Sequence, residues 1–198
     1  MADYATGDVL PLSEVNSKPR TRLLQEDAVP YRIPLSAFRW ADGLIPETTG
    51  AAGKPKLVMA GYGSGDGHFL GEDSKDAAKT ETIVFDFSLP AEYVAGQTVT
   101  VTVTAQYTDA GTSTMTTKTI DCEAYKIAEA GTAGSDICAT AIQTLTSSMA
   151  QYSFTVTPAS LSAGDSIRVF LQIITEGDTS AATKGKFGGA SVALDIKG

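Results

Sequence analysis

Two alternating segments joined by a corner that contains proline and glycine constrain the fold of this chain most strongly. Residues 80–89 carry apolar side chains at every second position, and residues 98–107 alternate small apolar residues with threonine. A period of two predicts two strands, each buried on one face. The corner of residues 90–97 is too long for a two-residue hairpin and lacks Asn-Gly or Asp-Gly, which favours a crossover between the two sheets of a sandwich. The side chains predicted to face the core are Ile83, Phe85, Phe87, Leu89, Val99, Val101, Val103 and Ala105.

The same strand-corner-strand device occurs twice in the chain. A Pro-Ala pair followed by an Ala-Gly pair stands at residues 90–96 and again at residues 158–164. We expect the Ala-Gly pair to turn the backbone tightly and Tyr93 or Leu161 to cap the end of the core. Two copies of one such unit predict two Greek keys wound into a jelly roll.

The whole pattern predicts an all-β, jelly-roll β-sandwich of about eight strands with an extended N-terminal arm. We assign residues 1–30 to the arm and residues 31–198 to the sandwich domain. Residues 128–136 are expected to form a loop, and residues 137–145, which fit a strand or a short helix, are assigned to a strand. The predicted strands are residues 33–39, 56–61, 80–89, 98–107, 113–125, 151–157, 166–175 and 190–196.

Residues 1–30 lack periodicity and carry three prolines, which push the residues before them toward extended backbone. Their leucines and valines are more numerous than a disordered linker usually carries. We therefore expect the arm to lie on a surface, either that of its own domain or that of a neighbouring subunit.

Composition excludes several function classes. The net charge is −8 and the only basic cluster is Lys18, Arg20 and Arg22, which argues against nucleic acid as a partner because phosphate binding needs a basic face. The first residues do not form a signal peptide and no apolar run reaches the length of a membrane span, so we expect a soluble protein made in the cytoplasm. With two cysteines, a disulfide-rich scaffold and a four-cysteine metal site are excluded; two buried thiols are favoured over a Cys122–Cys138 bridge.

Few residues suggest chemistry. His68 is the sole histidine, and its place beside a glycine-rich loop favours an exposed residue over a catalytic one. The glycine spacing of residues 61–67 matches no phosphate-binding loop. Trp40, Tyr62 and Phe69 fit a sugar-stacking platform, but we favour core or interface positions for them. We assign no catalytic, cofactor-binding or metal-binding residue and expect no enzymatic activity. The loop carboxylates that could bind Ca²⁺, but that we expect to be solvated, are Asp66, Glu72, Asp73 and Asp76.

An ordered series of segments carries a family resemblance. The series is IPLSAFRWADG, FSLPAEYVAGQTVTVTVTA, TIDCEAYK, GTAGSDICATAIQTL, FTVTPASLSAGDSIRV and the terminal VALDIKG. It resembles tailed-bacteriophage structural proteins encoded among head genes, which look like jelly-roll capsid decoration, or cement, proteins. The resemblance implies a virion protein on the capsid surface that binds the major capsid protein and stabilises contacts between its subunits.

Within that resemblance we expect the arm to carry the attachment and the protein to form a homotrimer, with a dimer as the second choice. The expected partner-binding residues are Leu10, Leu12, Lys18, Arg20, Arg22, Leu23 and Leu24. The alternative is a carbohydrate-binding or host-attachment β-sandwich module that uses Tyr62, His68 and Phe69. A hydrolase that uses Asp66 or Asp73 is a third hypothesis.

Overall fold

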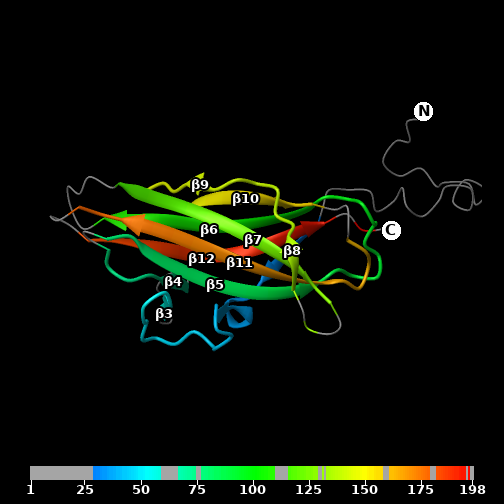
Figure 1. The fold of residues 1–198 in the computed structure, drawn as a ribbon, viewed down its shortest axis with the longest axis horizontal. Helices are drawn as coiled ribbons and strands as arrows, with labels where there is room; N and C mark the ends of the chain where they lie inside the picture. Colours follow the sequence, from blue (N-terminus) through cyan, green and yellow to red (C-terminus); the bar gives the residue numbers. More distant parts are fainter. Residues whose placement is uncertain are drawn as a thin grey trace, which may run out of the picture.

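Two antiparallel sheets face each other across one apolar layer, and their long strands run along the length of the molecule (Figure 1). The computed structural model describes residues 29–58, 67–74, 77–109, 116–128, 131, 133–157, 161–178, 182–194 and 196. Sheet A has the order β10 (Ala150–Val156), β6 (Val99–Asp109), β12 (Thr183–Leu194), β4 (His68–Leu70) and β3 (Lys56–Val58), with β1 (Val29–Ile33) also paired to β12. Sheet B has the order β2 (Arg39–Trp40), β5 (Lys79–Ser88), β11 (Ser166–Glu176), β7 (Thr117–Ile127) and β8 (Ala133–Asp136), with β9 (Gln143–Thr144) also paired to β7.

The chain changes sheet between consecutive long strands. In chain order, β5, β7 and β11 belong to sheet B, while β6, β10 and β12 belong to sheet A. Each long strand is therefore followed by one in the opposite sheet, which is how two Greek keys wind into a jelly roll. The predicted all-β jelly-roll sandwich is confirmed.

The two predicted corners meet at one end of the sandwich. Gly96 and Gly164 both have positive φ, +83° and +86°, which explains why each Ala-Gly pair ends in glycine. The corners also exchange backbone hydrogen bonds, because the Leu89 N–H donates to the Asp165 carbonyl and the Gly164 N–H donates to the Leu89 carbonyl, each at 2.9 Å. Tyr93 and Leu161 are buried beside them, as predicted.

The predicted core positions are confirmed, apart from Phe87, which is half-buried. The valines of β6 face the inner side of β5 and β11, and their complete burial supplies much of the apolar driving force. An aromatic cluster closes one side of this layer, where Phe38 lies edge-to-face against Phe69 and against Phe85, with ring centroids 5.3 Å apart in both pairs.

The predicted strand of residues 33–39 is wrong. A 3-10 turn, η2 (Leu35–Ala37), separates β1 from β2. Pro34 has no N–H to give a ladder, and its carbonyl instead accepts the Ala37 N–H at 2.9 Å. The turn directs Phe38 into the core.

The last predicted strand begins too late and two short ones were missed. β12 starts at Thr183, seven residues before the predicted start at residue 190, because pairing with β6 along its length outweighs the glycines at its centre. β4 was not predicted, and β8 lies where a loop was expected. Of residues 137–145, only Gln143–Thr144 form a strand, β9.

Most of the predicted arm lies outside the described residues. This holds for Leu10, Leu12, Lys18, Arg20, Arg22, Leu23 and Leu24. Val29 and Pro30, which we placed in the arm, are the first two residues of β1 and pair with β12.

The two corner glycines offer a direct test of the repeated device. We expect Gly96→Ala and Gly164→Ala each to lower the free energy of unfolding by about 1 kcal/mol, because a side chain is strained at positive φ. A methyl group at either position meets no atom within 4 Å, so the cost comes from the backbone alone. Denaturant unfolding measures it, with Gly134→Ala in β8 as the control, since Gly134 is not among the glycines with positive φ. Unchanged stability in both corner variants would contradict a requirement for glycine at these two corners.

Candidate functional site

The outer face of sheet A is hollowed into a trough that crosses the sheet from β10 to β1. The hollow measures about 1000 Å³, at the upper end of the range for ligand pockets. Its floor is the outward side of β6 and β12, and its walls come from β10 with the preceding Met149 on one side and from β1 with Pro34 and Leu35 on the other. We call this hollow the sheet A trough.

A β-bulge explains why the floor is low. The pairing of β12 with β6 shifts register between Phe187 and Gly189, which leaves Gly188 as the extra residue. Two adjacent glycines therefore stand at the centre of the sheet, and a Cβ added at Gly189 would meet no atom within 4 Å. Small residues in the middle and long side chains at the margins produce the concave shape.

Uncharged hydrogen-bonding groups line most of the trough. Because Val101, Val103 and Ala105 of β6 face the core, the residues between them face outward, and cross-strand pairing places those of β10 and β12 beside them. These side chains provide hydroxyl groups, which donate and accept, and amide groups, which do both at separate atoms. The uncharged polar residues of the lining are Thr102, Thr104, Gln106, Gln151 and Ser191.

The charged groups of the lining have one sign. Arg32 on β1 pairs across the sheet with Ser191, and Lys186 on β12 pairs with Gln106, so both lie on the outward side. Among the described residues that line the trough there is no aspartate or glutamate, and neither Arg32 nor Lys186 forms an ion pair with any described residue.

The outer face of sheet B differs, because its charges are paired. Arg168 of β11 makes two hydrogen bonds of 2.8 Å to the carboxylate of Asp86 on β5, directly across the strands. The Tyr125 hydroxyl donates to Glu123 at 2.9 Å, and the Tyr125 ring lies edge-to-face against Phe170. The groups on this face contact one another, so the sheet A trough offers more groups to a ligand.

Two of the three residues that we considered for sugar stacking, Trp40 and Phe69, lie outside the trough. Phe69 is wholly buried in the aromatic cluster, and Trp40 is buried with its ring N–H donating to the Pro55 carbonyl at 2.9 Å. Both are therefore core residues, as favoured from the sequence. Tyr62 lies outside the described residues, while His68 lies in the lining of the trough. Sequence reasoning missed the trough; its only signal was the run of small residues 188–191 after Phe187.

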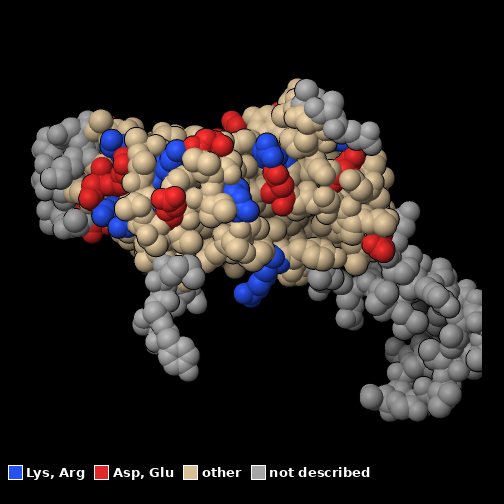
Figure 2. All heavy atoms as spheres, turned by 90° about the horizontal axis from the view of Figure 1, so that it is seen from below, with Lys and Arg blue, Asp and Glu red and all other residues tan. Residues whose placement is uncertain are grey.

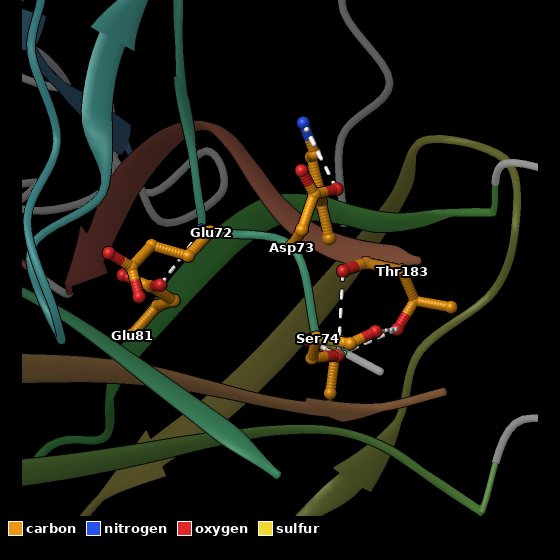
Figure 3. A network of polar contacts seen from close by, with 7 residues as sticks. Glu72, Asp73, Ser74, Glu81 and Thr183 are labelled. Atoms are coloured by element: carbon orange, nitrogen blue, oxygen red, sulfur yellow. Dashed lines mark hydrogen bonds and ion pairs between the residues drawn. The ribbon is translucent and has the colours of Figure 1, made fainter. Parts of the chain in front are cut away.

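Two of the four loop carboxylates form ion pairs at one end of the sandwich. Glu72 lies 3.8 Å from Lys79. Asp73 lies 3.2 Å from Lys184, and a dashed line from Asp73 marks this contact in Figure 3. Asp66 and Asp76 lie outside the described residues. No group of three or more histidine, cysteine, aspartate or glutamate residues within the described ranges could hold a metal ion.

Beneath these ion pairs, Glu81 of β5 is buried with 1% of its surface exposed. One carboxylate oxygen accepts the Glu72 N–H at 2.9 Å, while the other has no hydrogen-bond partner among the described residues (Figure 3). Burial raises the pKa of Glu81 to about 7; the Glu72 N–H and Lys79 act in the opposite direction, and the Glu72 charge adds to the rise. Next to it, the Ser74 and Thr183 hydroxyls lie 2.8 Å apart. This polar cluster ties residues 71–74 to both sheets.

The two cysteines are free thiols, as favoured from the sequence, but only Cys122 is buried, while Cys138 is half-buried. The hydrogen bond between the two thiols, followed by burial, raises the pKa of Cys122. The same hydrogen bond lowers the pKa of Cys138, against a smaller opposing effect of burial. Cys122 therefore stays protonated at neutral pH, which does not suit a nucleophile.

The remaining surface features agree with the composition. On the face shown in Figure 2, acidic and basic side chains gather at one end and are interspersed elsewhere, so no basic patch forms there. No helix in the described part of the chain is long and apolar enough to span a membrane.

Comparison with known proteins finds no family and only distant structural likeness. No protein-family model and no curated protein matches the chain. Among solved structures, the chain is similar to the CBM22-1 xylan-binding domain of Paenibacillus barcinonensis Xyn10C, with 12% identity over 87% of this chain and 98% of that one and a TM-score of 0.45. It is also similar to the xylan-binding module CBM15, with 13% identity over 86% of this chain and 99% of that one and a TM-score of 0.46. The third similar structure is the N-terminal cellulose-binding domain of Cellulomonas fimi β-1,4-glucanase C. It has 15% identity over 83% of this chain and 99% of that one, with a TM-score of 0.38. At such identities the likeness transfers no ligand to this chain.

Glu81 gives stability an unusual dependence on pH. Because its folded pKa of about 7 exceeds the ordinary 4.5, its contribution is most favourable below pH 4.5 and is lost as the pH rises through 7. Between pH 5 and pH 8 the wild type should lose about 2 kcal/mol of its free energy of unfolding for this reason. We expect Glu81→Gln, which retains an acceptor for the Glu72 N–H, to abolish this loss. Urea unfolding at both pH values measures the difference from the wild type, with the exposed Glu92→Gln as control. Parallel pH profiles for wild type and Glu81→Gln would contradict the raised pKa.

Proposed function

We propose that this protein is a non-catalytic carbohydrate-binding β-sandwich module whose ligand lies in the sheet A trough. The observation that carries the proposal is the lining itself, in which hydroxyl and amide side chains from three strands converge on an open floor. Sugars present hydroxyl groups that both donate and accept, and such side chains match them in both respects. A trough that crosses the sheet suits an extended chain of sugar residues better than one small molecule.

The trough also suits binding without catalysis. Its described lining has no carboxylate pair that could serve as the acid and base of glycoside hydrolysis. Absence of enzymatic activity stays a prediction, which assays for release of reducing ends from the bound polysaccharide would test.

A blocking variant tests the binding site. Gly189→Ile places a side chain over the floor without a clash, because a Cβ there has open space, and β-branched residues suit strands. We expect this variant to lose at least tenfold in affinity for the polysaccharides that retard the wild type in affinity gel electrophoresis. Gly134→Ile in β8, at the edge of the other sheet, is the matched control. Equal retardation of Gly189→Ile and wild type, or no retardation of the wild type by any polysaccharide, would refute the proposal.

Capsid decoration is the second candidate, and it rests on the segment resemblance. The ordered segments that resemble phage decoration proteins span most of the sandwich. Leu44 and Ile45, adjacent in the connection between β2 and β3, expose 57% and 67% of their surface and would be available for contact with a partner. In this proposal the protein is a virion component on the major capsid protein, and it self-associates as a trimer or, second, as a dimer.

Cosedimentation with phage heads that lack the protein tests this second candidate. We expect saturable binding at a fixed ratio to the major capsid subunit and loss of binding when residues 2–28 are deleted, because the arm residues Leu10, Leu12, Lys18, Arg20, Arg22, Leu23 and Leu24 would carry the attachment. Light scattering of the free protein gives its oligomeric state. Undiminished binding by the truncated protein would exclude the arm as the attachment, and failure of the full chain to bind would exclude decoration.

A further inference from the structure

We propose that the ligand of the sheet A trough is an acidic polysaccharide, a glycan chain that carries carboxylates, rather than a neutral one. This inference rests on the proposed function and concerns the charge of the ligand. It starts from an asymmetry: the chain as a whole has a net charge of −8, whereas the described charges that line the trough are Arg32 and Lys186.

The two cations are built into the surface by strand register. Arg32 lies opposite Ser191, and Lys186 lies opposite Gln106, so each extends from the same outward side as the hydroxyl and amide groups. On β12, Arg32 faces Ser191, so the two cations stand at the levels of Thr102 and Gln106 on β6. These levels are four residues apart, roughly 13 Å at the rise of a strand, because the bulge residue Gly188 adds no step to the ladder. Two positive groups at this separation, with neutral polar groups between them, fit a polymer whose negative charges recur along its length.

Neither cation is neutralised by the described part of the protein. The ion pairs of the described surface involve Lys54, Lys79, Lys126, Arg168 and Lys184. None of these residues lines the trough. A carboxylate in the trough would therefore meet positive groups that are not already engaged by described carboxylates, and the fit of opposite charges would raise both affinity and specificity.

The backbone of the floor argues for a glycan over an acidic peptide. Peptides often bind sheets by adding a strand to a free edge, which needs unpaired backbone groups. In the trough, β6 is paired to β10 and β12, and β12 is paired to β6 on one side and to β1 and β4 on the other. Recognition on this floor must use side chains, which suits a ligand rich in hydroxyl groups.

Matched variants and matched probes test the inference. The probes are polygalacturonate and its fully methyl-esterified form, which differ in charge and not in the sugar. The variants are Arg32→Gln and Lys186→Gln, with Arg168→Gln on the outer face of sheet B as the control that makes the same change in net charge. Affinities come from affinity electrophoresis and calorimetry at low and high salt.

We expect polygalacturonate to bind about tenfold more tightly than its ester at low salt, with the difference abolished in the double variant and at high salt and retained in Arg168→Gln. Equal binding of both probes that is lost in Gly189→Ile would overturn the acidic ligand and leave the carbohydrate-binding proposal standing. Binding of neither probe, together with no binding of other acidic or neutral polysaccharides, would overturn both. Equally tight binding of poly-glutamate or single-stranded DNA would replace the glycan by a general polyanion and overturn the inference.

Discussion

The pairing of β6 with β12 is the constraint on which the rest of the structure depends. Side chains alternate between the two faces of a strand, so one register fixes both faces at once. In the register observed, Val101 lies opposite Val192 on the buried side, and Thr102 lies opposite Ser191 on the outward side. A slip by one residue would expose the valines and bury the hydroxyl groups, so the apolar core protects the geometry of the trough.

The bulge at Gly188 gives the β6–β12 pair its concave outward face. It interrupts the register between Phe187 and Gly189 without ending the strand, so that Phe187 still reaches the core. A short section without side chains then stands between longer strand sections that carry them. The consequence is a concave outward face on a rigid sheet, which needs no mobile loop to shape it.

The end of the sandwich away from the two corners shows how the fold accommodates polar groups in its interior. Glu81 is buried beneath the Glu72–Lys79 and Asp73–Lys184 ion pairs, and Gly71 approaches it so closely that an added Cβ would lie 2.8 Å from Glu81 Cγ. The glycine is required because the carboxyl side chain fills the space. This packing links the segment between β4 and β5 to the sandwich. Its free-energy cost depends on whether Glu81 is charged, because burying a carboxylate is unfavourable.

The sequence permitted the fold to be predicted where local and tertiary preferences agree. The valine alternation of β6 and the Ala-Gly pairs at Gly96 and Gly164 reported strands and corners correctly. Where tertiary pairing decides, prediction failed: the glycines of β12 resemble a loop until β6 is placed beside them, and the turn after Pro34 depends on Phe38 reaching the core. The trough could not be predicted, because it is assembled from outward residues of strands that are distant in sequence.

The outward side of the β6–β12 pair is, in our proposal, a binding surface for an acidic carbohydrate chain. The most direct test is an NMR titration of the isotopically labelled protein with oligogalacturonate, followed through backbone amide shifts. We expect the shift changes to cluster at the outward positions of β6 and β12, around Thr104, Gln106 and Ser191. Shift changes confined to sheet B around Tyr125 and Phe170, or none at saturating oligosaccharide, would contradict it.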